Sequence, residues 1–510
     1  MLLTTAPDTS QEPQLALPSS SQTINYYDRF YDPLDPERQS ESPAVLRDYP
    51  ANDLGNAKRF LDICRNFVRY CPPEKCWYIF DRTSWKPDNA NLIHMLAQTS
   101  LNLSYQKEFD HRKEIASIQE LQSLMKSQTR AGNLSTIQNC LGVAAAYAVI
   151  QPEQFDADPD WFHTQDGAIN VQTWDALLYH ERRLLFTKTA GASLQLTLPS
   201  VSRAIEPECP RWIQFVKECC SGDDDLYRYL QKAAAYSILT GDISQQKVFC
   251  LLGAGRNGKS LFINTLAAVA GDYARKIESS VLCVNRFGDK DSDTSKELYR
   301  IRGSRFVYSN EFGRNSLLNE NFIKAITDGG RIACRPLYGS SIEYAPTYTL
   351  WFSTNHMPNL QAMDEGIRRR IVVIPFRNSL REDQIDRTLP ETLQNEANGI
   401  LYWLLQGYSR YITDGLTPPE AVQNATASYF NEQDPYQIFL DEYYTVSQND
   451  KVYAKTLYQN YVHWCAENGE KPVSNTSFGK ELQRLGIAKT RDRKGYYYAL
   501  REKEPDNFTE

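Results

Sequence analysis

The sequence has no long apolar run, and no stretch of its 510 residues approaches the roughly 18 apolar side chains of a membrane span. Its amino terminus, MLLTTAPDTSQEPQ, lacks the basic and apolar segments of an export signal, so we expect a cytoplasmic protein. Only 6 histidines are present, and the 11 cysteines form no pair of C-x-x-C elements, which argues against a structural zinc site. We therefore expect ordinary buried thiols in a reducing compartment.

The chain also lacks an excess of positive charge. Its 56 lysines and arginines stand against 63 acidic residues, for a net charge of −7. This balance excludes a protein coated with basic surface. It does not exclude nucleic-acid binding, because a ring-shaped assembly can hold its positive charge in a central channel.

Composition and pattern divide the chain into five parts. Residues 1–55 are rich in Pro, Ser, Asp and Gln and predict a disordered leader. Residues 56–238 predict a helical and mixed domain, residues 239–380 an α/β core, and residues 381–420 a helical connector. Residues 421–510 predict a winged-helix-like domain.

Two turns are predicted within the amino-terminal domain. The aromatic segment Cys76–Trp85 favours a hairpin around Asp81–Ser84, and the sequence Gln165-Asp-Gly167 favours a second turn. Apolar residues at helical spacing predict a helical stretch over residues 207–239.

Four short apolar runs, separated by helical stretches, define the α/β core. They are Val248–Leu252, Phe306–Ser309, Tyr348–Ser353 and Ile371–Ile374. Continuous apolar strands are usually buried on both faces, so the pattern predicts a parallel sheet flanked by helices.

A phosphate-binding motif follows the first of these runs. The sequence from Gly253 to Ser260 matches G-x-x-x-x-G-K-[ST] in full, with a predicted strand before it and a helix over residues 261–270 after it. Its eight residues are Gly253, Ala254, Gly255, Arg256, Asn257, Gly258, Lys259 and Ser260. The motif predicts an ATP site in which backbone N–H groups and Lys259 contact phosphate and Ser260 ligates Mg²⁺. The alternative is a glycine turn with a solvated lysine.

Two further strand ends supply candidate catalytic side chains. Glu311 follows the run that ends at residue 309, where a Walker B carboxylate for metal and water belongs. Asn355 follows the next run and could orient water against the γ-phosphate, or it could simply form a polar turn.

Three consecutive arginines, Arg368 to Arg370, precede the last core strand. In a ring, such an arginine can enter the neighbouring ATP site and stabilise transition-state charge. Where such arginine fingers have been measured, they contribute on the order of 10³–10⁵ in rate.

The order and wording of these motifs resemble superfamily 3 helicases, in particular the helicase part of phage, plasmid and poxvirus primase-helicases. The resemblance covers about residues 55–500. It is carried most specifically by residues 328–339 (DGGRIACRPLYG), 348–358 (YTLWFSTNHMP) and 369–376 (RRIVVIPF).

The resemblance implies an AAA+-like core, a homohexameric ring, single-stranded and fork DNA as substrates, and a separate primase or polymerase as partner. It makes Glu311 the Walker B acid, Asn355 the sensor, and Arg369, with Arg370 beside it, the arginine finger. The family's DNA-gripping hairpin would span about residues 334–344. Within it, Arg335 suits a phosphate contact and Tyr338 suits base stacking.

Two departures from the family pattern stand out. Many members have two adjacent acids at Walker B, whereas Asn310 precedes Glu311 here, so both metal ordering and water activation would fall on one carboxylate. Residues 1–55 contain no Asp-x-Asp metal pair, so we expect no priming activity.

The last 40 residues predict a helix followed by a basic hairpin. Ser474 is a helix-capping residue and Gly486 a helix stop, and Lys489, Arg491 and Arg493 precede the aromatic strand at Tyr496. A winged helix presents such a hairpin to DNA, although the same module can serve protein contacts alone.

Three hypotheses follow. The first is a DNA helicase. The second is a P-loop kinase or other phosphotransferase, which would need a lid and an acceptor site and has no use for the arginine segment. The third is a DNA-binding initiator or remodelling ATPase that does not unwind. Stimulation of ATP hydrolysis by single-stranded DNA separates the first from the second, and strand displacement separates it from the third.

Overall fold

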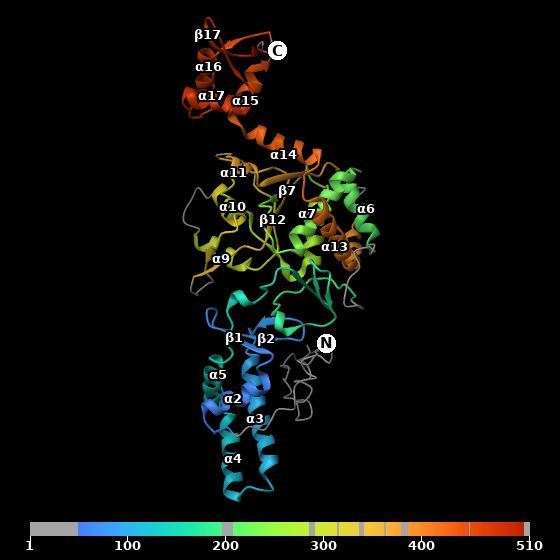
Figure 1. The fold of residues 1–510 in the computed structure, drawn as a ribbon, viewed down its shortest axis with the longest axis vertical. Coiled ribbons are helices and arrows are strands. Elements are labelled where there is room, and N and C mark those ends of the chain that lie inside the picture. The colour runs from blue at the N-terminus through green and yellow to red at the C-terminus, as the bar shows by residue number, and fades with distance from the viewer. Residues whose placement is uncertain are drawn as a thin grey trace, which may run out of the picture. The chain divides into compact units, whose positions relative to one another are not determined.

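The computed structural model describes residues 49–195, 208–284, 291–313, 316–335, 341–361, 364–378, 386–447 and 449–503 (Figure 1). The chain forms two compact units. The first comprises residues up to Ile205 together with residues 270–273, and the second begins at Glu206. Most of the expected leader lies outside the described residues, and the first described helix begins at Asp53.

Helices and a small antiparallel sheet build the first unit. The helices are α2 (Asp53–Cys64), α3 (Leu92–Arg112), α4 (Ile118–Ala131) and α5 (Leu134–Ala145). Strands β1 (Val68–Cys71), β2 (Cys76–Phe80) and β3 (Trp85–Pro87) pair in that order. The hairpin predicted around residues 81–84 is confirmed, since β2 and β3 pair antiparallel across it.

A second antiparallel sheet of the first unit consists of β4 (Trp161–Thr164), β5 (Gly167–Asn170) and β6 (Ala176–Leu177). The predicted turn at residues 165–167 joins β4 to β5 and is also confirmed. His163 of β4 is fully buried here and stacks on Phe186, with ring centroids 4.6 Å apart.

The second unit contains a five-stranded parallel sheet in the order β13-β7-β12-β9-β8. Its strands are β7 (Val248–Leu252), β8 (Ala274–Lys276), β9 (Phe306–Asn310), β12 (Thr349–Thr354) and β13 (Ile371–Pro375). The four runs predicted from sequence are all strands of this sheet, to within one residue at each end. Strand β8 was not predicted.

Both faces of this sheet are buried, as continuous apolar strands require. Cys250 and Val373 belong to one hydrophobic cluster with Ile323 of α10 (Glu320–Thr327). On the other face, the Trp351 indole N–H donates to Ser237 Oγ of α7 (Asp224–Leu239) over 2.9 Å. Alternate strand residues therefore face different helices, and the core has three layers.

Helices α6 (Pro210–Cys219) and α7 are part of the second unit. Trp212 of α6 stacks on Phe262 of α8 (Lys259–Ala270), with ring centroids 5.4 Å apart. Trp212 also meets Trp403 of α13 (Ala397–Asp414) edge-on. The division between the two units falls after residue 205.

Four more helices belong to the second unit, and α14 is the longest of them. They are α9 (Asp291–Arg300), α11 (Glu365–Arg368), α12 (Leu389–Asn395) and α14 (Glu420–Gln433). Helix α14 packs along β13, and its Thr426 hydroxyl accepts the Val373 N–H over 2.9 Å.

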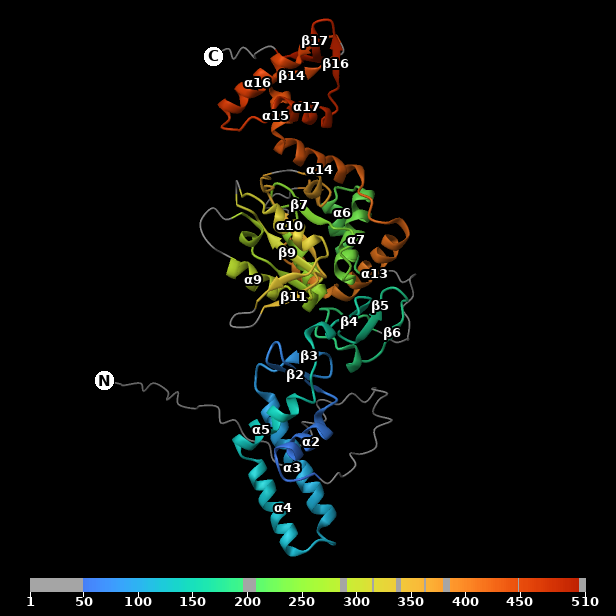
Figure 2. The same ribbon diagram turned by 60° about the vertical axis from the view of Figure 1, so that its left-hand side comes forward.

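A small module with its own core ends the chain (Figure 2). Its helices are α15 (Pro435–Tyr443), α16 (Ala454–Glu467) and α17 (Asn475–Arg484). Its strands are β14 (Tyr444–Val446), β15 (Val452–Tyr453), β16 (Lys489–Asp492), β17 (Gly495–Tyr498) and β18 (Leu500–Glu502). Ser474 caps α17 by accepting the Ser477 N–H, so the predicted helix and its cap are confirmed.

Among the described residues, no helix is both long enough and apolar enough to cross a membrane.

Candidate nucleotide-binding site

Three adjacent parallel strands end at one edge of the sheet. Thr354 of β12 is in register with Leu252 of β7, and Ser353 is in register with Asn310 of β9. The residues that follow these strand ends are therefore neighbours. They are Gly253, Glu311 and Asn355, so the sheet brings together three sequence-predicted positions that lie about fifty residues apart along the chain.

Residues 253–258 connect β7 to the amino terminus of α8. Gly255 has φ +103° and Gly258 has φ +83°, which side-chain-bearing residues rarely adopt. A Cβ at Gly258 would lie 2.8 Å from Cys219 Sγ and 2.9 Å from the Phe215 ring. The loop is thus packed closely against α6. Gly255 and Gly258 allow its backbone conformation, and Gly258 also leaves room for the side chains of α6.

The Lys259 ammonium group is buried among neutral oxygens. It donates to the Gly253 carbonyl at 2.8 Å, to Asn257 Oδ1 at 2.7 Å and to Asn355 Oδ1 at 3.0 Å. Its residue is 4% exposed, and burial lowers the pKa of its amine, partly offset by the charge of Glu311. Hydrogen bonds to a charged group contribute about 1.5–3 kcal/mol each, whereas burying an ion costs several kcal/mol. A nearby anion would therefore stabilise this amine.

Asn355 links the lysine to the acidic candidate. Its Nδ2 donates to Glu311 Oε1 at 3.3 Å, while its Oδ1 accepts from Lys259. The expected sensor, lysine and Walker B acid therefore form one hydrogen-bonded chain, although Asn355 and Glu311 follow different strands and Lys259 begins α8.

A cavity of about 330 Å³ lies beside this chain. It is lined by Ser260, Lys276, Ile277, Glu278, Ser279, Ser309, Asn310 and Glu311. Asn310 Oδ1 is buried and has no hydrogen-bond partner among the described residues. A hydroxyl, a carboxylate and an unpaired amide oxygen form a donor set suited to a hydrated Mg²⁺ ion. The side chains present thus fit a magnesium nucleotide.

The three consecutive arginines have different environments. Arg370 is 2% exposed, donating through Nε to Thr327 Oγ1 at 2.8 Å and through Nη1 to the Gly366 carbonyl at 2.6 Å. Arg368 pairs with Asp434 at 3.2 Å. Arg369 is exposed, and its guanidinium makes no hydrogen bond or ion pair within the described part of the chain. Arg370 would have to leave these bonds to reach another subunit, whereas Arg369 would not.

The expected DNA hairpin is partly described. Strands β10 (Ile332–Cys334) and β11 (Ile342–Tyr344) pair antiparallel. Arg335 follows β10 and is exposed. Tyr338 lies outside the described residues.

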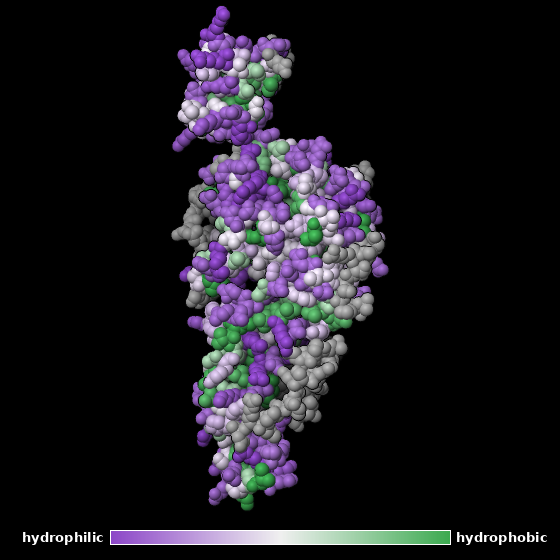
Figure 3. Space-filling view, viewed as in Figure 1, coloured by the Kyte–Doolittle hydropathy of each residue, from purple (hydrophilic) through white to green (hydrophobic). Residues whose placement is uncertain are grey.

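Basic and aromatic side chains meet on the carboxyl-terminal hairpin β16–β17. Arg491 is opposite Tyr496 in the register, and its guanidinium carbon lies 5.4 Å from the centre of the Tyr496 ring. Lys489 Nζ lies 4.6 Å from the same centre, and the tyrosine is 49% exposed. Arg493 is exposed at the turn. Hydrophilic residues cover most of this module in the view of Figure 3.

Sequence reasoning missed two features of the site. Asn257 Nδ2 donates to the Phe376 carbonyl at 3.1 Å, so it joins the lysine to the end of β13. Glu278 lines the cavity from beyond strand β8. Strand β8 is only three residues long and includes Arg275 and Lys276, so its sequence has no apolar run that would predict a strand.

Three family matches cover most of the described chain. Residues 57–221 match the family described as "D5 N terminal like". Residues 251–370 match a family of unknown function, DUF5906, and residues 431–507 match the family described as "Poxvirus D5 protein-like".

Curated viral proteins are similar over part of their length. The "Putative helicase L207/L206" of Acanthamoeba polyphaga mimivirus is 28% identical over 45% of this chain and 26% of its own. The "Putative helicase V13" of Sputnik virophage is 26% identical over 42% of this chain and 29% of its own. The "Putative primase C962R" of African swine fever virus is 25% identical over 38% of this chain and 22% of its own. The aligned regions thus span about a quarter of these relatives.

Among solved structures, the apo NrS-1 C-terminal region aligns with 89% of this chain and 99% of its own, at 12% identity and a TM-score of 0.46. On the family and sequence matches, the chain is a primase-helicase-like protein. More particularly, segments near both ends of its described sequence match D5-type families.

Proposed function

We propose that this protein is a cytoplasmic, ATP-dependent DNA helicase of superfamily 3 that works in the replication of a phage, plasmid or similar mobile element. The observation that carries the proposal is the chain of hydrogen bonds from Lys259 through Asn355 to Glu311. It lies where a phosphate-binding loop meets the ends of neighbouring parallel strands.

The side chains divide the work of ATP hydrolysis. Lys259 would donate to phosphate oxygens in place of its present neutral acceptors. The negative phosphate would then balance the charge of the buried ammonium group. Ser260 and Glu311 would hold Mg²⁺, which neutralises phosphate charge when bound. Glu311 would also accept a proton from the attacking water, and Asn355 would orient that water between the lysine and the carboxylate.

Arg369 completes the site from a neighbouring subunit in this proposal. It is exposed, and the adjacent arginines are held by Asp434 and Thr327. A homohexameric ring would place each Arg369 against the next subunit's γ-phosphate.

DNA contacts would come from two hairpins. In the ring, Arg335 and Tyr338 would line the channel and contact single-stranded DNA. The carboxyl-terminal module would act as a winged helix, with Lys489, Arg491 and Arg493 on the phosphates of fork DNA. A separate primase or polymerase would be its partner.

A second candidate function is a replication initiator or remodelling ATPase that does not unwind. The cluster of Lys489, Arg491 and Tyr496 favours it, because stable DNA attachment through that hairpin needs no translocation. A strand-displacement assay separates the two. Unwinding of a forked duplex supports the helicase, and DNA-stimulated ATP hydrolysis without unwinding supports the initiator.

Replacing Lys259 tests the nucleotide site. We expect Lys259→Ala to fold and to lose ATP turnover by at least about a hundredfold, because one oriented charge is worth about 3–4 kcal/mol in the transition state. The measurement is steady-state phosphate release with and without single-stranded DNA. Normal hydrolysis by Lys259→Ala, or an inactive wild-type protein, would end the proposal.

A further inference from the structure

A buried carboxylate lies between α14 and α15. Asp434 is 1% exposed, and both of its oxygens are used. Oδ1 accepts the backbone N–H groups of Tyr436 at 3.0 Å and Gln437 at 3.4 Å, which caps α15. Oδ2 accepts from the Nη2 atoms of Arg368, at 3.2 Å, and of Arg484.

The two arginines come from different parts of the second unit. Arg368 is the last residue of α11 in the α/β core, and Arg484 is the last residue of α17 in the carboxyl-terminal module. Asp434 Oδ2 therefore accepts from both the core and the carboxyl-terminal module. Removing one partner of a buried ion pair is costly because the other charge stays buried without compensation.

Helix α14 is fixed to the nucleotide-binding part of the core. Besides the bond from Val373 to Thr426, the Tyr429 hydroxyl donates to the Pro358 carbonyl at 2.7 Å. Pro358 follows Asn355 by three residues. The end of α14, and with it Asp434, is thus attached to the same strands that carry the nucleotide site.

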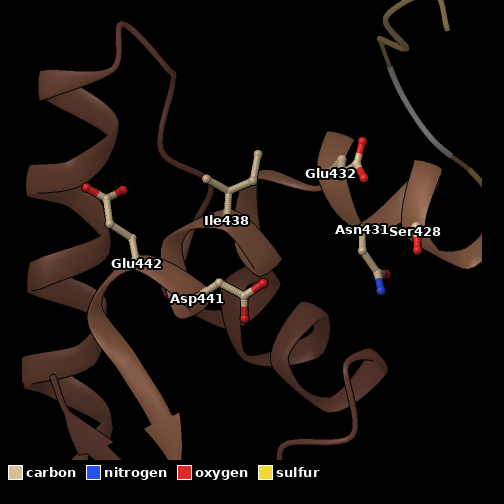
Figure 4. A pocket seen from close by; sticks show the side chains of 6 residues that line it. All are labelled: Ser428, Asn431, Glu432, Ile438, Asp441 and Glu442. Atoms are coloured by element: carbon tan, nitrogen blue, oxygen red, sulfur yellow. The ribbon is translucent and has the colours of Figure 1, made fainter. Parts of the chain in front are cut away.

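The junction beyond α14 is open on one side. A cavity of about 640 Å³ is lined by side chains of both α14 and α15 (Figure 4). Three of the lining residues are acidic, namely Glu432, Asp441 and Glu442. Because like charges repel, these carboxylates do not draw the two helices together.

The attachment at Asp434 also bears on Arg369, because Arg369 is next to Arg368 in the sequence. Arg369 lies between Arg368, which Asp434 holds, and Arg370, which Thr327 and Gly366 hold. We propose that Asp434 is a positioning residue through which the carboxyl-terminal module sets the orientation of Arg369. The proposal rests on the proposed function in treating Arg369 as the arginine finger.

The structural part of the proposal is tested without nucleotide or DNA. Arg484→Ala removes the module's side of the junction and leaves Arg368 in place. Hydrogen–deuterium exchange of the full chain should rise at least threefold in peptides covering residues 364–370. The matched control is Arg501→Ala, which breaks the exposed pair with Asp450 in the same module and should leave these peptides unchanged. Unchanged exchange in Arg484→Ala would overturn the proposal.

The functional part is tested by a double-mutant cycle. Arg484→Ala should lower kcat for ATP at least threefold with KM within twofold of wild type, because the phosphate loop is untouched. In an Arg369→Ala background, the same change should have no further effect. Additive losses would mean that Arg484 only supports the fold, and would overturn the proposal.

The outcomes distinguish this inference from the proposed function. A wild-type protein without ATPase activity, or a fully active Arg369→Ala, refutes the proposed role of the site or of the finger. The exchange experiment still reports on the junction in either case. Active wild type with additive losses refutes the positioning role alone.

Discussion

At the scale of single residues, hydrogen-bond partners decide what each charged group can do. Lys259 has three neutral acceptors and no ion pair within the described residues, so dipoles and the nearby charge of Glu311 compensate it. Arg370 is bonded through each of its nitrogens to residues of its own subunit. Arg369 and Arg370 are adjacent in the sequence and carry the same charge. Their different environments suit them to different roles.

His163 gives a prediction at this scale. Its Nδ1 lies 2.8 Å from the Lys188 carbonyl, so that nitrogen carries the hydrogen, and Nε2 accepts from His180 Nδ1. Burial lowers the pKa of His163 to about 4, while the hydrogen bond to Lys188 opposes the shift. The unfolded chain, with a pKa of about 6.5, therefore binds a proton that the folded chain does not.

We expect the stability of the first unit to be full above about pH 6.5 and to fall as pH drops toward 4, by up to about 3 kcal/mol. Thermal unfolding between pH 7.5 and 4.5 measures the loss. His163→Gln should flatten the dependence, whereas replacing the exposed His463 should leave it unchanged. An equally steep dependence in His163→Gln would contradict the assignment.

Residues of the site were predictable where their pattern is continuous in the sequence. The eight residues from 253 to 260 could be recognised because the loop needs glycine, lysine and serine at fixed spacing. The environments of the three arginines were not predictable. Their partners, Asp434, Thr327 and Gly366, are set by tertiary packing.

At the scale of elements, burial on two faces made the strands predictable. Strands β7, β9, β12 and β13 each contain a run of at least three apolar residues, because helices cover both sides of the sheet. Strand β8 is short, lies at the sheet edge and contains two basic residues, so no period marks it. The place of α6 in the second unit depends on Trp212 packing against Phe262, a contact that helical spacing does not reveal.

The hairpin β16–β17 gives a prediction at this scale. Lys489→Ala with Arg491→Ala should weaken binding of forked DNA about tenfold or more, since two phosphate contacts are lost. The slope of log K against log salt should become shallower by about 2. The measurement is fluorescence anisotropy over a range of salt concentrations.

The matched control is Lys455→Ala with Lys471→Ala, which removes the same charge from exposed positions of the module outside the hairpin. An equal loss in both pairs would mean that net charge, and not the hairpin, determines binding.

At the scale of the whole molecule, the described modules have separate cores, and Asp434 pairs with arginines from two parts of the second unit. The described cores are separate clusters around Phe60, Val307 and Phe439. On the proposals above, the link through Asp434 would let DNA binding at the carboxyl-terminal module change the proposed ATP site without rearranging the sheet. The residue order along the chain gave no indication of this link, because Arg368, Asp434 and Arg484 are far apart in sequence.

The central claim is that the ATP site is completed by Arg369 of a neighbouring subunit, and mixing two inactive variants tests it most directly. Arg369→Ala should lose most of its ATPase activity, on the order of 10³-fold or more. Lys259→Ala should be inactive for a different reason. After subunit exchange is demonstrated by fluorescence transfer, an equal mixture should have about a quarter of its junctions complete, with Lys259 on one side and Arg369 on the other. We predict partial recovery of DNA-stimulated ATP hydrolysis in the mixture. No recovery despite exchange, or full activity of Arg369→Ala alone, would contradict the account.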